Sequence, residues 1–170
     1  MVAVRILPEN SKAAVVAIGV SIVGCTLAIV AIDAAFRTSL TTQYLATFAQ
    51  QPAGLTPMMI GKAAMEELVG RLLLEGGMLT VAGLALRERK IGPWLLLAII
   101  LAAQILILLP DLAAPAGVTE WVYDAVRFVG PGVLWGWLFW RHGFVAALLG
   151  HTGTHPLLDP ALHALLGRPH

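Results

Sequence analysis

Five long apolar segments, separated by shorter polar ones, divide this sequence. They cover residues 13–35, 58–86, 94–109, 121–140 and 144–167. A hydrocarbon core about 30 Å thick needs roughly 20 apolar residues per helix, so the chain has room for about five spans and little else. The first segment is too long for the apolar region of a signal peptide, and we expect it to be retained as a helix. The pattern predicts an all-α polytopic membrane helix bundle of about five spans, in a single membrane domain over residues 1–170.

Composition agrees with this prediction. Hydrophobic residues make up 58% of the 170 residues and charged residues only 12%, and the mean hydropathy is +0.82. These values are typical of an integral membrane protein. The formal net charge is +1, and Lys and Arg are scattered over the loops, so nothing indicates nucleic-acid binding. We expect the partners to be the lipid bilayer and molecules embedded in it. The single cysteine, Cys25, excludes an intrachain disulfide, and its apolar surroundings predict an inert thiol.

The polar segment 37–57 is rich in Thr, Gln, Pro and Gly, and it is either a loop or a short helix lying in the membrane interface. Orientation follows from the basic residues, because Lys and Arg concentrate in cytoplasmic loops. In the predicted bundle one side carries Arg5, Lys12, Arg87, Arg89, Lys90 and Arg141. We therefore expect the N-terminus to be cytoplasmic.

Charged residues interrupt the second apolar segment at Glu66, Glu67 and Arg71. Charge within a membrane span is costly and usually functional. Glu67 and Arg71 are four residues apart, as are Lys62 and Glu66, so each carboxylate has a basic partner on its own helix face. Two such ion pairs would allow a polar stripe inside a bundle without any chemistry. In the functional interpretation one carboxylate acts as a general base that takes a proton from water, and Glu75 competes for the arginine.

The last apolar segment carries a polar residue every four positions, at His151, His155 and Asp159. In one continuous helix these side chains would face roughly one direction. Pro156 and Pro160 argue against a continuous helix, and Asp159 before Pro160 is also typical of the N-cap of a short terminal helix. A histidine pair four residues apart also suits Zn²⁺, with a glutamate as third ligand.

These motifs occur in a familiar order. The Glu66-Glu67-x-x-x-Arg71 motif is followed by a Gly- and Trp-rich segment, 132–143, that contains Arg141-x-Gly143, and then by a His-x-x-x-Asp element. The arrangement resembles the CPBP family of intramembrane proteases, which includes the CAAX prenyl endopeptidases and bacteriocin-processing or Abi proteins. The resemblance covers about residues 58 to 160. It implies a hydrolase in which a glutamate activates water inside the bilayer, in a prokaryotic cytoplasmic membrane, without a required cofactor.

The resemblance assigns the site residues. Glu67 would activate water, with Glu66 as its partner or alternate. Arg71 would hold a carboxylate or the bundle in place, His151 or His155 would stabilise the oxyanion, and Asp159 would orient the histidine. One element of the family pattern is missing, because the FxxxH histidine of the third span corresponds here to Leu108. His151 is then an additional imidazole that would take its place.

Two further readings stay beside the protease. The chain would be a non-catalytic CPBP relative that binds a membrane peptide or a partner helix, which the missing histidine favours. Alternatively it would be a small transporter component that uses the same charges as an ion path. The sequence also leaves open whether the protein acts alone or packs against further membrane subunits. Counting along the helices at about 1.5 Å per residue places His155 and Glu67 at depths that differ by about 10 Å, so counting does not bring them together.

Overall fold

The computed structural model describes residues 5–86, 91–112 and 117–167, and these residues form helices without any strand. The all-helical prediction is confirmed. The elements are α1 (Ser11–Ala35), η1 (Arg37–Ser39), α2 (Thr42–Ala49), α3 (Pro52–Glu67), η2 (Leu68–Glu75), α4 (Gly76–Ala85), α5 (Pro93–Leu112), α6 (Val118–Asp124), η3 (Ala125–Val129), α7 (Gly130–His142), α8 (Phe144–Thr152) and α9 (His155–Leu166). Each predicted apolar segment corresponds to a helix or to a run of consecutive helices.

Two of these runs contain a π-helical stretch. The helices α3, η2 and α4 follow one another without a break, and η2 is the π-helical part. The same holds for α6, η3 and α7, where η3 is π-helical. A π-helical turn holds one more residue than an α-helical turn and is frequent at functional sites. Both stretches contain a buried arginine, Arg71 in η2 and Arg127 in η3.

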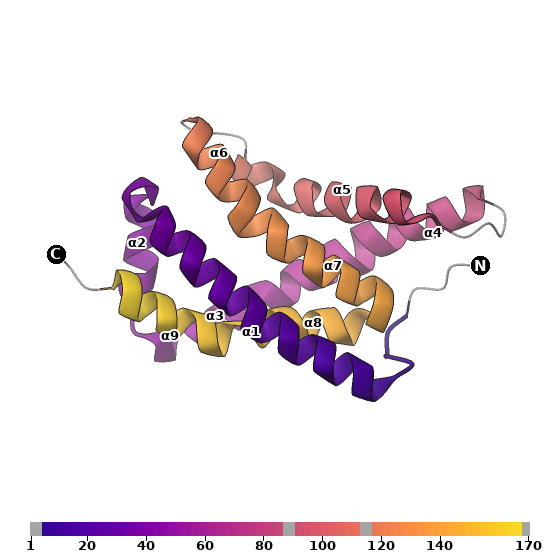
Figure 1. Ribbon diagram of the computed structural model, residues 1–170, viewed down its shortest axis with the longest axis horizontal. Coiled ribbons are helices and arrows are strands. Elements are labelled where there is room, and N and C mark those ends of the chain that lie inside the picture. The colour runs from indigo at the N-terminus through magenta and orange to yellow at the C-terminus, as the bar shows by residue number, and fades with distance from the viewer. Residues whose placement is uncertain (1–4, 87–90, 113–116, 168–170) are drawn as a thin grey trace.

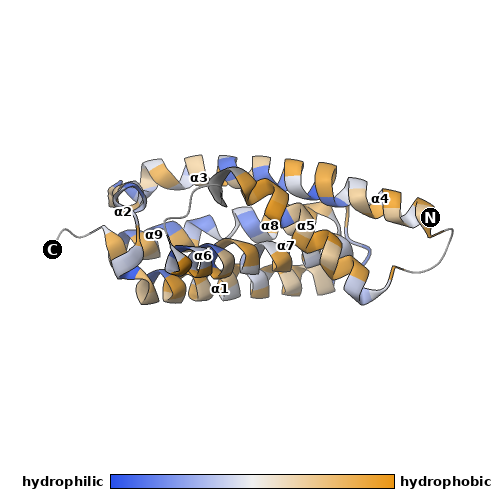
Figure 2. Ribbon diagram, turned by 90° about the horizontal axis from the view of Figure 1, so that it is seen from above, coloured by the Kyte–Doolittle hydropathy of each residue, from blue (hydrophilic) through white to orange (hydrophobic). Residues whose placement is uncertain are grey.

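The helices lie roughly along one long axis (Figure 1). Viewed from above, α3 and α4 run along one side of the bundle and α1 along the other, with α7 and α8 between them (Figure 2). Helix α8 packs against α1, α3 and α7, and α9 packs against α1, α2 and α3. This arrangement places the end of α3 opposite the junction of α8 and α9.

Short segments set the ends of the helices. Asn10 caps α1 by accepting a hydrogen bond from the Ala13 amide over 3.1 Å. At the α7–α8 turn, Gly143 has a φ of 90°, a left-handed conformation that favours glycine. The first amides of α8 are satisfied by the N-terminal segment, because the Phe144 amide donates to the Arg5 carbonyl over 2.9 Å. The N-terminal segment therefore holds the α7–α8 turn in place.

Segment 37–57, which the sequence left open between a loop and a short helix, contains helix α2. Among the described residues, two helices are long and apolar enough to cross a membrane, Ser11–Ala35 and Pro52–Ala85, and Pro93–Leu109 is a shorter apolar helix. The prediction of about five spans goes beyond this finding and stays a prediction. Hydrophobic colours run along most of the helices, with hydrophilic segments also in the middle of the bundle (Figure 2).

Candidate functional site

All six residues singled out in the sequence line one cavity of about 440 Å³. Glu66 and Glu67 come from the end of α3 and Arg71 from η2, while the other three come from α8 and α9. Counting residues predicted that His155 and Glu67 differ in depth by about 10 Å, yet both line this cavity. The end of α4 extends past the ends of α7 and α8 in both views (Figures 1 and 2), so counting from that end places Glu67 too deep.

The centre of the site is a contact between Glu67 and His151, which are 84 positions apart in the sequence. Nδ1 of His151 lies 3.0 Å from Oε1 of Glu67, and both residues are buried. Nε2 of the same ring lies 4.0 Å from Oε2 of Glu66. When Nδ1 carries the ring proton and donates it to Glu67, Nε2 is left as a hydrogen-bond acceptor facing Glu66.

The ring of His151 is also held from its face. The indole of Trp135 on α7 stacks on the imidazole with 3.6 Å between ring centroids and 15° between planes. Trp135 is buried as well. Stacking fixes the plane of the ring and the bond to Glu67 fixes its rotation, so His151 has one well-defined orientation.

His155 and Asp159 form a second pair, in which Nδ1 of His155 lies 3.0 Å from Oδ1 of Asp159. Asp159 has no exposed surface, and the rings of His155 and His151 lie 5.7 Å apart between centroids. The alternative in which Asp159 caps a terminal helix is wrong. Helix α9 already begins at His155, because Pro156 falls in the first turn, where its missing N–H is not needed. Asp159 is left to face the cavity from within the helix.

Arg71 is almost completely buried and binds three elements at once. On its own helix, Nε lies 3.4 Å from Oε2 of Glu67 and NH1 lies 3.1 Å from Oε2 of Glu75. NH2 donates to Oε1 of Gln104 on α5 over 2.8 Å and to the carbonyl of Gly132 on α7 over 2.7 Å. Arg71 thus ties η2 to α5 and α7 and holds Glu67 beside His151.

Both ion pairs predicted from helical spacing are present. Glu67 pairs with Arg71, and Nζ of Lys62 lies 3.6 Å from Oε1 of Glu66. The two pairs differ in environment, since the Lys62 and Glu66 side chains are 68% and 38% exposed and the other pair is buried. Glu66 is therefore the carboxylate that is accessible from the cavity, and Glu67 is the one fixed by neighbours.

The third span contributes no imidazole to the cavity. Leu108, which stands at the position of the family's histidine, lines the cavity together with Gln104. The Gln104 amide is already engaged, because it accepts from Arg71 and donates to the Phe128 carbonyl over 3.4 Å. On this wall the cavity offers an apolar surface.

A second polar cluster, missed by the sequence analysis, borders the cavity through Tyr44 and Arg127. Asp33 on α1 accepts from Nε of Arg127 over 3.0 Å, from Tyr123 over 3.0 Å and from Tyr44 over 2.6 Å. Arg127 also donates to the Tyr44 hydroxyl over 3.1 Å. Burial raises the pKa of Tyr44 to about 12, and Asp33 adds to this effect. The signal was available, because Asp33 and Arg127 each place a charge inside an apolar segment.

Among the described residues, no group of three or more His, Cys, Asp or Glu side chains is arranged to hold a metal ion. Zinc bound by His151, His155 and a glutamate stays an alternative from the sequence. No family model matches this chain, and no curated protein or solved structure matches it either. The resemblance to CPBP proteases therefore stands on the motifs alone.

Proposed function

We propose that this protein is an intramembrane endopeptidase of the CPBP type, which hydrolyses a peptide bond in or near the membrane with a glutamate-activated water. The observation that carries the proposal is the buried contact between Glu67 and His151, with the accessible Glu66 facing the other nitrogen of the ring. Burying charge of this kind in an apolar bundle is energetically costly, and such residues usually have a function.

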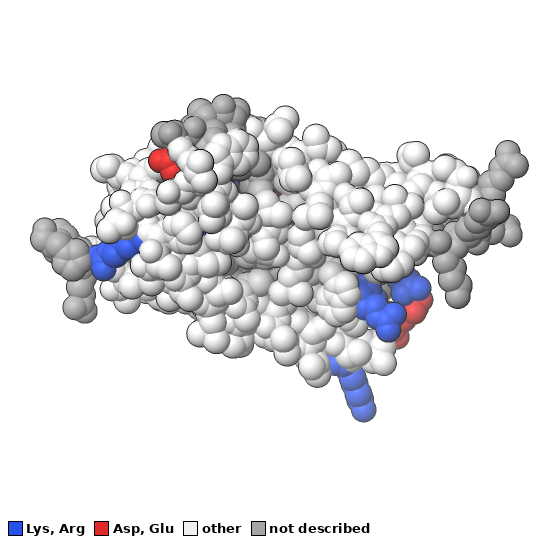
Figure 3. Space-filling view, turned by 45° about the horizontal axis from the view of Figure 1, so that its top comes forward, with Lys and Arg blue, Asp and Glu red and all other residues white. Residues whose placement is uncertain are grey.

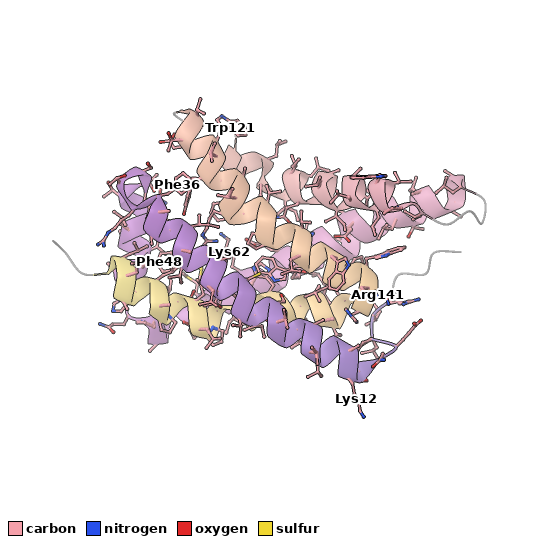
Figure 4. All side chains as sticks on the ribbon, in the orientation of Figure 1. Lys12, Phe36, Phe48, Lys62, Trp121 and Arg141 are labelled. Atoms are coloured by element: carbon pink, nitrogen blue, oxygen red, sulfur yellow. The ribbon has the colours of Figure 1, made fainter. Side chains whose placement is uncertain are left out.

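The surface of the bundle supports a membrane location with about five spans. Only 22% and 28% of the most apolar stretches of Ser11–Ala35 and Pro52–Ala85 are buried inside the protein, so most of their apolar side chains face outward. Large hydrophobic side chains are also exposed on α5 and α6, among them Leu106 and Val122. On the face shown in Figure 3, charged side chains lie towards the two ends of the molecule and the surface between them is uncharged, whereas the exposed Lys62 lies between the two ends in Figure 4. A lipid bilayer would cover this uncharged band.

In the proposed reaction, one water lies between Oε2 of Glu66 and Nε2 of His151, whose separation of 4.0 Å lets one molecule hydrogen-bond to both. The general base consists of the Glu67 carboxylate and the His151 imidazole that it contacts, and Glu66 lies beside them. The water oxygen attacks the peptide carbonyl carbon while its proton passes to this carboxylate–imidazole group. The same proton then goes to the leaving amine as the C–N bond breaks.

The second pair has a different task. His155 donates a hydrogen bond to the oxyanion that forms on the carbonyl oxygen, and Asp159 orients the ring from a distance of 3.0 Å. Both residues line the same cavity as Glu66 and Glu67. Arg71 positions Glu67 through its contacts with α5 and α7.

One observation favours a second function. Leu108 offers no donor at the place of the family's histidine, so the chain is alternatively a non-catalytic CPBP relative whose cavity binds a membrane peptide or partner helix. A small transporter component that uses the same buried charges is a third reading. It requires proton flux in liposomes that disappears in Glu67→Gln without any peptide cleavage.

The deciding experiment incubates the purified protein with a library of membrane peptides and reads cleavage by mass spectrometry. Loss of a general base typically costs about 10²–10⁴ in rate and loss of one oxyanion donor about 10²–10³, so we expect Glu67→Gln and His155→Ala each to lose at least about 10². Wild-type cleavage that persists unchanged in His151→Ala would exclude the role assigned to that ring. His142→Ala is the matched control, because His142 lies at the end of α7 outside the cavity.

Two outcomes would overturn the proposed protease function. If the wild type cleaves nothing but crosslinks to the same peptides, the binding reading replaces it. If both glutamate and histidine variants cleave like the wild type, the cavity is not the catalytic site.

A further inference from the structure

The two ends of the bundle differ in charge. Lys12 and Arg141 lie at the same end (Figure 4), and the Arg5 carbonyl binds the start of α8 there. In the described part of the chain this end carries Arg5, Lys12 and Arg141, and Glu9 pairs with Arg5 over 3.0 Å. This end therefore has the excess of basic residues that marks the cytoplasmic side of a membrane protein.

The opposite end is formed by helix α2 and by the connection from α5 to α6. Phe36, Phe48 and Trp121 mark it in Figure 4, and Lys62 lies between the two ends. Among the described residues, Arg37 is the basic residue near the helix ends here, against Arg5, Lys12 and Arg141 at the other end. By the same rule this end belongs on the non-cytoplasmic side.

The cavity opens towards the α2 end. Of the residues that line it, all of which are described, only Thr41, Gln43 and Lys62 are exposed. Thr41 caps α2 and Gln43 lies in its first turn, while Lys62 reaches Glu66 over 3.6 Å. On the other side, the lining residues from α7 and α8, Trp135 and His151, are buried. The path from solvent to Glu66 therefore starts beside α2 and Lys62.

The walls between this mouth and the glutamates combine apolar side chains with polar ones, among them Tyr44, Asp124 and Arg127. The apolar part comes from α1, α3, η3 and α9, among them Ile29, Met59, Phe128 and Leu158. The apolar side chains can pack against apolar groups of a ligand, and the polar ones can bind its hydrogen-bonding groups. An extended polypeptide can place apolar side chains against the first set and its backbone N–H and C=O groups against the second.

We infer that the cavity takes its substrate from the non-cytoplasmic face of the membrane, as an extended polypeptide segment with apolar side chains that enters between α2 and Lys62. This inference rests on the proposed function for the nature of the substrate. The orientation rests on the charges and on the position of the exposed lining residues.

The test is cysteine labelling with a membrane-impermeant maleimide, starting from a Cys25→Ser background. Gln43→Cys reports the mouth, and Lys12→Cys is the matched reporter at the opposite end. Both positions are exposed, so these variants keep the fold. We expect Gln43→Cys to be labelled in right-side-out membrane vesicles and Lys12→Cys only in inverted vesicles. Labelling with the two orientations exchanged would overturn the inference.

Access to the site itself is tested with Glu66→Cys in the same vesicles. We expect modification from the side that labels Gln43→Cys, and slower modification when an apolar peptide from the cleavage library is added on that side. Modification of Glu66→Cys from the Lys12→Cys side would overturn the inference even if the orientation is correct. Labelling needs no catalysis, so a protein that cleaves nothing but gives this pattern refutes the protease and keeps the entry side. Cleavage by a protein whose Glu66→Cys variant is labelled from the Lys12→Cys side keeps the protease and refutes the entry side.

Discussion

His151 contacts Glu67 through Nδ1 over 3.0 Å, although the two residues belong to helices far apart in the sequence. The contact joins the end of α3 to the end of α8, and Trp135 covers the ring from α7. Three helices therefore meet at one imidazole. A relationship of this kind is measurable as a coupling energy, independently of any activity.

We predict that Glu67→Gln and His151→Ala are not additive in stability. Residues in direct contact typically show a coupling energy of about 0.5–3 kcal/mol in a double-mutant cycle. The cycle is measured by denaturant unfolding of the purified protein in detergent. Glu67→Gln combined with His142→Ala is the control pair, and it should be additive. Equal additivity in both cycles would mean that the Glu67–His151 contact is absent in the folded protein.

Removing the Arg71 guanidinium should destabilise the bundle strongly. Arg71→Met leaves Glu67 and Glu75 buried without their shared counter-charge, and breaking a buried pair in this way costs about 3–5 kcal/mol. Lys62→Met is the matched control, because its exposed ion pair should be worth only about 0–1 kcal/mol. Unfolding free energies of both variants check the prediction. Adding Glu75→Gln to Arg71→Met should recover part of the loss, and a loss no larger than that of Lys62→Met would contradict the prediction.

Gly132 on α7 lets Gln104 approach the backbone. A Cβ at position 132 would clash with the side-chain amide of Gln104, which holds Arg71. Overpacking of this kind costs about 1–3 kcal/mol, so we expect Gly132→Ala to lower the thermal stability. Gly130→Ala on the same helix has no atom within 4 Å of its new Cβ and serves as the control. A Gly132→Ala protein as stable as the Gly130→Ala protein would show that Gln104 does not pack there.

Tyr44 predicts a dependence of stability on alkaline pH. Its hydroxyl donates to Oδ2 of Asp33, and burial raises its pKa from 10.0 to about 12. A raised pKa means that the folded state favours the protonated phenol. This contribution is complete below pH 10 and is lost as the pH rises through about 12. The stability advantage of the wild type over Tyr44→Phe should therefore shrink across this range, whereas an unchanged difference would exclude the assignment.

Much of the local structure was predictable from the sequence alone. The long apolar runs predict helices because a single segment in an apolar environment can satisfy all its backbone hydrogen bonds only as a helix. The pairs Glu67–Arg71, Lys62–Glu66 and His155–Asp159 follow from a spacing of four residues, which places both side chains on one helix face. Such contacts depend on a few neighbouring residues, so a local pattern determines them.

Only the tertiary structure decided which helix faces meet. It brings His151 rather than His155 to Glu67, supplies Gln104 and the Gly132 carbonyl to Arg71, and joins Asp33 to Arg127 across 94 positions. Two π-helical stretches change the phase of the helices between these residues, and the α8–α9 break falls before His155. Contacts between helices depend on the packing of whole elements, and counting residues along one helix does not contain that information. The sequence determined which side chains are charged within the apolar segments; the packing decided their partners.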